Sequence, residues 1–177
     1  MAGNVIEFEL SEPMNLFVEI EGEEKHPLFI FVSPLEVDVP DAQDSNVIYF
    51  GPGVHDVGRM HTDLPSGTTV YVAGGAYVKG LFGTQINADP VHFRGRGIIS
   101  GIEYEHNPSV WENHMLYIPG SANQKDVYIE GLTFTDGPKT CINTRSGAVI
   151  DNVKCFGWKA NTDGTNTGAD IDLEQWR

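Results

Sequence analysis

Basic residues are scarce in this sequence, and their scarcity excludes one large class of protein. There are 11 Lys and Arg against 25 Asp and Glu, so the formal net charge is −14 over 177 residues. A chain with this charge is repelled by a phosphate backbone, because binding a nucleic acid requires a basic surface. We therefore expect no nucleic-acid partner.

Cysteine is also scarce, and Cys141 and Cys155 are the two thiols of the chain. Two thiols are too few for a disulfide scaffold, and neither lies in a zinc-binding spacing with another Cys or His. No pair among the six histidines has a metal-ligand spacing either, and we interpret His106 and His114 as solvated loop residues. We expect no metal and no cofactor, while the redox state of the thiols stays open.

Long apolar runs are missing as well. No stretch approaches the roughly 18 consecutive apolar residues that a membrane helix needs, so we expect no membrane partner. Residues 1–4 lack the basic and then apolar pattern of a signal peptide.

Glycine and proline, by contrast, are abundant. The chain has 20 Gly and 10 Pro, yet 40% of its residues are hydrophobic. This composition is typical of a turn-rich globular chain with little helix. We therefore predict an all-β protein.

The first 45 residues form one segment, with short alternating apolar runs separated by breakers. The runs are Val5–Leu10, Leu16–Ile20 and Leu28–Val32. Alternation of this kind predicts β-strands. We assign residues 1–45 to an N-terminal β-strand segment and residues 46–177 to a second domain.

The second domain repeats one unit, in which a short apolar run is followed by a glycine bend and another apolar run. The bends at Gly53, Gly75 and Gly97 are 22 residues apart, and those at Gly131 and Asn152 are 21 apart. A repeat of this length made of strands is typical of a parallel β-solenoid, here of about five coils. An antiparallel sandwich with regular turns is the alternative.

A short motif near the end of the repeats resembles a known enzyme family. Asn161-Thr162-Asp163-Gly164 is similar to the Asn-Thr-Asp-Gly motif of the polygalacturonase-like, or pectin lyase-like, glycoside hydrolases. Gly157-Trp158-Lys159 and the repeats Val47–His55 and Val70–Gly80 resemble the dextranase and isopullulanase branch. The resemblance implies a right-handed parallel β-helix preceded by a β-sandwich. It also implies inverting hydrolysis of a polysaccharide, in an extracellular or periplasmic location.

The resemblance implies that Asp163 is a catalytic carboxylate. The family supplies the partner carboxylates as an Asp-Asp pair, with a Gly-His-Gly motif beyond it, and this sequence contains neither. Relative to a complete enzyme we therefore expect the chain to be truncated. The alternative for Asp163 is a plain turn residue, because Asn-Thr-Asp-Gly also favours a turn.

Five further residues are candidates for substrate binding, because aromatic faces stack on sugar rings and loops carry binding groups. They are Trp158, Lys159, Asn161, Tyr104 and Trp111. Structural packing is the alternative for the three aromatic residues.

Two functions follow from these observations. The first is a polysaccharide-directed, endo-acting glycoside hydrolase of the glucanase or polygalacturonase type, or a piece of one. The second is a non-catalytic carbohydrate-binding or structural β-helix module. The negative charge favours a neutral glucan over a polyanion, and the open end of a solenoid favours self-association.

Overall fold

The structure is a computed structural model, and it describes residues 5–19, 27–106, 113–121, 123–145, 147–157, 159 and 165–167. The chain divides into two compact units, Met1–Val37 and Asp38–Arg177. The sequence predicts a boundary after residue 45, which is further along the chain than the boundary between these two units. Asp38 belongs to the second unit, and its main-chain oxygen accepts a hydrogen bond from Nη1 of Arg94 in that unit (3.2 Å).

The first unit contains one antiparallel pair, β1 (Met14–Val18) and β2 (Leu28–Val32). These two strands match the predicted runs at Leu16–Ile20 and Leu28–Val32 closely. The prediction of a strand over Val5–Leu10 is wrong, because these residues have no regular structure. In the described part of this unit β1 and β2 pair with each other, and residues 5–10 pair with neither.

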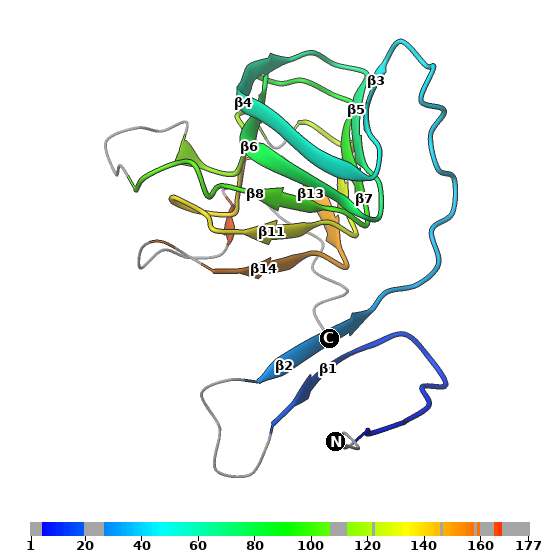
Figure 1. The fold of residues 1–177 in the computed structure, drawn as a ribbon. Coiled ribbons are helices and arrows are strands. Elements are labelled where there is room, and N and C mark those ends of the chain that lie inside the picture. Colours follow the sequence, from blue (N-terminus) through cyan, green and yellow to red (C-terminus); the bar gives the residue numbers. More distant parts are fainter. Residues whose placement is uncertain are drawn as a thin grey trace. The chain divides into compact units, whose positions relative to one another are not determined.

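The second unit consists of two parallel sheets (Figure 1). The five-stranded sheet contains β3 (Val47–Phe50), β5 (Thr68–Val72), β7 (Val91–Gly95), β10 (Val127–Glu130) and β13 (Ala148–Asp151). The eight-stranded sheet contains β4 (Gly53–Leu64), β6 (Ala76–Thr84), β8 (Ile98–Ser100), β9 (Leu116–Ile118), β11 (Thr133–Thr135), β12 (Ile142–Thr144), β14 (Lys154–Phe156) and β15 (Thr165–Thr167).

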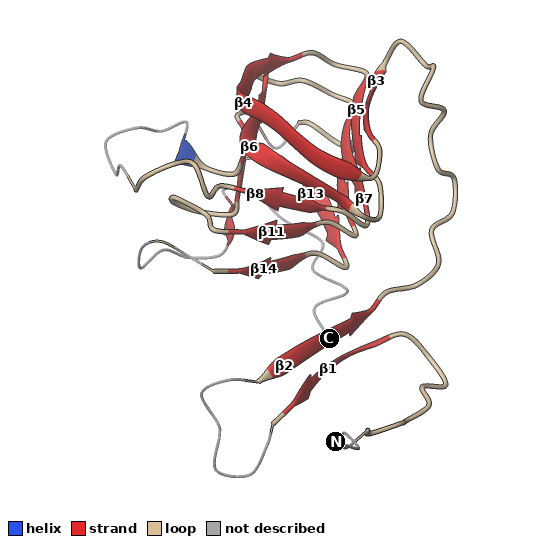
Figure 2. Ribbon diagram, viewed as in Figure 1, coloured by secondary structure: helices blue, strands red, loops and turns tan. Residues whose placement is uncertain are grey.

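The chain alternates between the two sheets, which makes the unit a parallel β-solenoid. Each strand of the five-stranded sheet pairs with the equivalent strand one coil away, for example Val70 with Phe93 and Ile129 with Ile150. In the described part of the chain, four full turns separate β3 from β13. The all-β parallel helix is thereby confirmed, and the antiparallel sandwich is excluded for this unit. Figure 2 shows almost no helix among the described residues, and none of them forms a helix long and apolar enough to cross a membrane.

The corners of the solenoid lie where the glycine repeat predicts them, with one exception. Gly53, Gly75, Gly131 and Asn152 all have positive φ angles, a conformation that glycine and asparagine tolerate. In the third copy the positive φ belongs to Gly95 and not to Gly97. Gly97 is required for another reason, since a Cβ there would lie 2.6 Å from the main-chain oxygen of Ala73.

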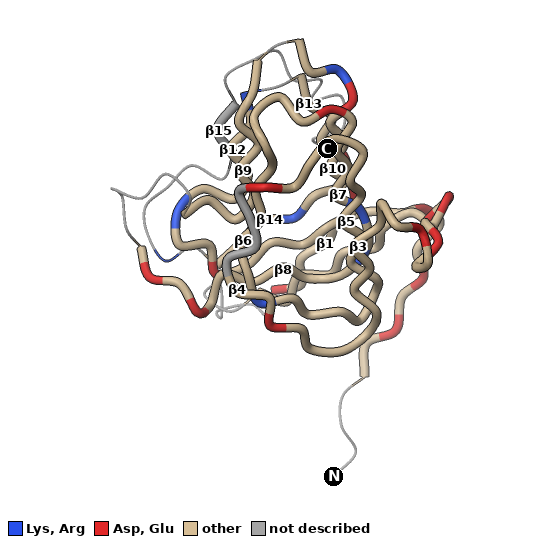
Figure 3. The backbone as a smooth tube through the Cα atoms, turned by 90° about the horizontal axis from the view of Figure 1, so that it is seen from above, with Lys and Arg blue, Asp and Glu red and all other residues tan. Residues whose placement is uncertain are grey.

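The core fills the space between the two sheets. Alternate side chains of each strand point inward and are fully buried, as Val70 and Phe93 are from one sheet and Val78, Ile99 and Phe134 from the other. Figure 3 shows that charged residues lie mainly in the loops and corners. The stacking of coils therefore buries the apolar surface that one coil alone exposes.

The eight-stranded sheet has two arms, and this division creates the loops of interest. Strand β6 runs through both arms, pairing with β8 at Tyr77–Lys79 and with β9 at Phe82 and Gly83. In the next three coils a loop interrupts the sheet between the arms. We call their described residues the first, second and third inter-arm loops, which are residues 101–106 with 113–115, residues 136–141, and residues 157 and 159.

Candidate functional site

The first two inter-arm loops lie against each other. The main-chain nitrogen of Gly101 donates to the main-chain oxygen of Thr135 (2.9 Å), and Nδ1 of His106 lies 2.7 Å from the main-chain oxygen of Pro138. A Cβ on Gly101 would lie 2.7 Å from Cδ of Pro138. Glycine at this position therefore allows the two loops to approach closely.

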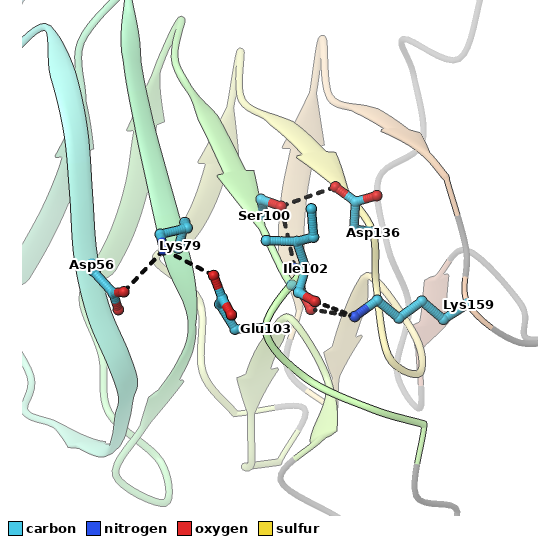
Figure 4. Close-up of polar contacts among 8 residues, drawn as sticks. Asp56, Lys79, Ser100, Ile102, Glu103, Asp136 and Lys159 are labelled. Atoms are coloured by element: carbon cyan, nitrogen blue, oxygen red, sulfur yellow. Dashed lines mark hydrogen bonds and ion pairs between the residues drawn. The ribbon is translucent and has the colours of Figure 1, made fainter.

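Lys159 joins the third loop to both of the others, and Figure 4 shows its contact with the first. Its main-chain nitrogen donates to the main-chain oxygen of Gly137 (3.1 Å). Its Nζ donates to three main-chain oxygens of the first loop, those of Gly101 (3.2 Å), Ile102 (2.5 Å) and Tyr104 (2.6 Å). An ammonium group has three donors, so all of them are engaged in holding the loops together. The sugar contact predicted for Lys159 stays a prediction, and it would displace one of these bonds.

A row of charged side chains continues across the earlier coils. Lys79 Nζ lies 3.0 Å from an oxygen of Asp56 and 2.8 Å from an oxygen of Glu103. The hydrogen bond to Glu103, and second to it the hydrogen bond to Asp56, raises the pKa of Lys79 above its usual value. The Lys79–Asp56 hydrogen bond also lowers the pKa of Asp56. These groups are solvent-exposed, so the pairs contribute little to stability. They place alternating charge beside the first inter-arm loop (Figure 4).

Asp136 begins the second loop, and sequence reasoning missed it. Its Oδ2 accepts hydrogen bonds from Oγ of Ser100 (2.9 Å) and Oγ1 of Thr135 (3.0 Å). Its φ angle is 57°, in the left-handed region. The signal was available in the sequence, because Thr135-Asp136-Gly137 repeats the last three residues of the motif at 161–164. The two copies differ in position, since Asp136 directly follows β11 whereas Asp163 precedes Thr165, the first residue of β15.

His114 and Asn143 form a buried polar pair at the start of the second arm. His114 is 2% exposed and Asn143 5% exposed. The amide nitrogen of Asn143 donates to Nε2 of His114 (3.0 Å), and the imidazole stacks on Tyr117 with 5.6 Å between ring centroids. The interpretation of His114 as a solvated loop residue is therefore wrong. It lies two residues before β9, which pairs with β12, and it is buried at that position.

Burial has a direct effect on the titration of this histidine. Desolvation, with a smaller contribution from the charge of Lys139, lowers the pKa of His114 to about 4. The imidazole is therefore neutral at neutral pH. Its Nδ1 atom is buried and has no hydrogen-bond partner among the residues that the structure describes.

Several predicted site residues fall outside the described part of the chain. They are Asp163, Trp158, Asn161 and Trp111. Tyr104 is described, and its side chain packs partly buried against the core, so its sugar contact also stays a prediction. Among the residues that the structure describes, no group of three His, Cys, Asp or Glu could hold a metal ion.

Comparison with known proteins identifies two relatives that match most of this chain. The chain is 29% identical to a dextranase of Arthrobacter globiformis over 140 residues, which is 70% of this chain. It is 30% identical to a dextranase of Arthrobacter sp. (strain CB-8) over 147 residues, which is 75% of this chain. The chain spans less than a quarter of the length of these relatives, 22% and 23%.

Two other comparisons found nothing. No family model matches the chain, and no solved structure matches it. The parallel solenoid and the two dextranase relatives nevertheless agree with each other, and together they confirm the resemblance to β-helix glycoside hydrolases that the motifs indicated.

Proposed function

We propose that this chain is part of the β-helix of a glycoside hydrolase that cleaves a neutral glucan of the dextran type. The similarity to two dextranases over 70% and 75% of the chain is the observation that carries this proposal. The inter-arm loops provide the place for a site, because a rigid stack of strands supports them and Lys159 ties them together.

In this proposal Asp163 acts as one carboxylate of an inverting pair. Inversion needs a general acid at the leaving oxygen and a general base for the water, with the two carboxyl groups about 6.5–9.5 Å apart. Lys159 lies four residues before Asp163 in the chain. The three bonds of its ammonium group hold Lys159 against the first inter-arm loop.

The substrate is proposed to be an uncharged polymer. The net charge of −14 repels polyanions such as pectate. The proposed location is extracellular or periplasmic, as the resemblance to β-helix glycoside hydrolases implies. Trp158, Asn161, Trp111 and Tyr104 are the proposed sugar contacts, with the aromatic rings stacking on pyranose faces.

Binding and hydrolysis should be measured separately on the 177-residue chain. Isomaltooligosaccharides titrated by NMR or calorimetry are expected to bind weakly, and Trp158→Ala should weaken binding about tenfold or more, as loss of a stacking contact does. Tyr49→Ala is the matched control, because Tyr49 is an exposed ring of the five-stranded sheet, stacked on Tyr71. Equal affinity of the unsubstituted chain, Trp158→Ala and Tyr49→Ala for the oligosaccharides would overturn the proposed binding site.

Hydrolysis of dextran tests the catalytic part of the proposal. The sequence contains no Asp-Asp pair, and losing one of two catalytic carboxylates commonly costs about 10²–10⁴ in rate. We expect the chain by itself to release negligible reducing sugar. Robust hydrolysis that Asp163→Asn abolishes would show that a carboxylate of this chain, such as Asp170 or Asp172, completes the pair.

The alternative is a non-catalytic carbohydrate-binding or structural module on the same scaffold. This alternative predicts that Trp158→Ala weakens sugar binding and that Asp163→Asn leaves binding unchanged. The same result is predicted for this chain alone and for a fusion of this chain with the remaining part of a dextranase. Restored hydrolysis in such a fusion, lost again in Asp163→Asn, would exclude the alternative.

A further inference from the structure

The outer face of the second arm differs in chemistry from the other outer faces of the solenoid. In the first arm, Asp56 and Lys79 are register partners on neighbouring coils and form an ion pair. In the five-stranded sheet, Arg94 and Glu130 do the same. One register position of the second arm, by contrast, is uncharged on every coil that the structure describes there. It is occupied by Gly83, Tyr117, Asn143 and Asn166.

Tyr117 is the aromatic residue at this position. Its neighbours along β9, Leu116 and Ile118, are fully buried in the core, so the alternation of a strand directs the Tyr117 side chain to the outer face. The side chain is partly exposed there. In the preceding coil its register partner is Gly83, which has no side chain to occupy the space beside the ring. The ring of Tyr117 is therefore placed to contact a ligand.

A buried polar pair holds this ring. The imidazole of His114 stacks on Tyr117, with 5.6 Å between ring centroids and 21° between ring planes. The amide nitrogen of Asn143, the register partner of Tyr117 on the next coil, donates to Nε2 of His114 (3.0 Å). His114 and Asn143 are 2% and 5% exposed. Their effect on a ligand at the surface therefore passes through Tyr117.

We propose that Tyr117 contacts the substrate as a stacking platform for one sugar ring, and that His114 and Asn143 are positioning residues for this platform. The inference rests on the proposed function, and it adds a contact on the second arm to those proposed above. Strand β15 belongs to the same arm and lies two coils from β9, through β12. Two coils span about 10 Å, so one polysaccharide chain can reach both Tyr117 and the segment that leads into β15.

The chemistry of the platform suits an uncharged sugar. A tyrosine ring offers an apolar face to the CH groups of a pyranose, and its hydroxyl both donates and accepts hydrogen bonds. The imidazole beneath the ring adds no charge at neutral pH, because burial, with a smaller contribution from the charge of Lys139, lowers the pKa of His114 to about 4. A face without charge does not select for ionic ligands.

The test titrates isomaltohexaose into the 177-residue chain by calorimetry. Tyr117→Ala should weaken binding about tenfold, as loss of a stacking contact does. Tyr117→Phe should weaken it about threefold at most, because it keeps the ring and loses one hydrogen bond. Tyr77→Ala is the matched control, since Tyr77 is a partly exposed tyrosine on the outer face of the first arm. Its affinity should equal that of the unsubstituted chain.

His114→Gln tests the positioning role. Glutamine keeps an acceptor for Asn143 but removes the ring on which Tyr117 stacks. We expect the affinity to fall about threefold, and the NMR signals of the Tyr117 ring to shift in the variant without sugar. A purely structural role for His114 would lower the stability of the protein and leave the affinity of the folded chain unchanged.

The outcomes separate this inference from the proposed function. If Trp158→Ala weakens binding and Tyr117→Ala does not, the inference is overturned and the proposed function stands. If the unsubstituted chain binds no isomaltohexaose, both are overturned. Equal losses in Tyr117→Ala and Tyr77→Ala would overturn the inference as well. One further measurement needs no variant, because the Tyr117 ring signals of the unsubstituted chain should shift as the sugar binds, and unchanged signals at saturation would contradict the contact.

Discussion

Lys159 Nζ lies 2.6 Å from the main-chain oxygen of Tyr104, a residue 55 positions earlier in the chain. One ammonium group thus closes a contact between the first and third inter-arm loops, across the coil that separates them. Hydrogen bonds from a charged donor are stronger than those between neutral groups. The contact therefore decides how the segment leading to Asp163 starts.

Replacing Lys159 by methionine should loosen both loops while leaving the solenoid folded. Methionine keeps much of the length of the side chain but donates no hydrogen bond, so three main-chain oxygens each lose one hydrogen bond. That of Gly101 still accepts one from the main-chain nitrogen of Tyr104 (2.9 Å). The expected loss of stability is about 2 kcal/mol. Hydrogen exchange at residues 101–106 should accelerate, with that of β5 and β7 unchanged. Lys125→Met, at an exposed turn, is the control, and equal exchange in both variants would contradict this role.

The buried histidine should make the protein sensitive to acid. The pKa of His114 is lowered to about 4 in the folded chain, against about 6.5 in an unfolded one. Between these two values the unfolded state binds more protons, so stability is present above pH 6.5 and is lost as the pH falls towards 4. Protonation of this residue lowers the free energy of unfolding by up to about 3 kcal/mol.

His114→Gln isolates this effect, because glutamine is neutral at every pH and its oxygen can accept the hydrogen bond from Asn143. Urea unfolding at pH 7 and at pH 4.5 should show a smaller loss in the variant than in the unsubstituted protein. Identical pH dependence in the two proteins would rule out His114 as the responsible group.

Substitution of two glycines separates the loss of stability caused by close packing from the loss caused by backbone strain. At Gly97 a Cβ would lie 2.6 Å from the main-chain oxygen of Ala73 and 2.9 Å from that of Ala76. At Gly67 there is open space, but the φ angle is +86°. We expect Gly97→Ala to cost about 3 kcal/mol by overpacking and Gly67→Ala about 1 kcal/mol by strain. Denaturant unfolding measures both, and the opposite order would contradict the stacking of coils at the Gly97 corner.

Asp136 should be replaceable by asparagine but not by alanine. Asparagine tolerates the φ angle of 57° and keeps one oxygen for Ser100 and Thr135. Alanine loses both acceptor oxygens and is strained at this φ angle. The expected costs are about 0.5 kcal/mol for Asp136→Asn and about 2 kcal/mol for Asp136→Ala. Similar midpoints for the two variants in thermal unfolding would show that the carboxyl group does not order the second loop.

The sequence by itself determined the solenoid and most of its corners. Alternating apolar residues predict which side chains enter the core, and a coil repeats them at a nearly constant spacing. Gly53, Gly75, Gly131 and Asn152 mark the corners because the positive φ angle there is a local requirement that few residue types meet. Local rules of this kind need no knowledge of the remaining chain. They fail at Val5–Leu10, because a strand also needs a partner to pair with.

Only the tertiary structure decided which residues of different coils meet. The inter-arm loops differ in length, so no fixed spacing predicts that Lys159 reaches the oxygens of Gly101, Ile102 and Tyr104. The same lack of spacing hid the burial of His114. The physical reason is that the repeat fixes the backbone of each coil, whereas contacts across coils depend on the register between coils and on the path of the inserted loops.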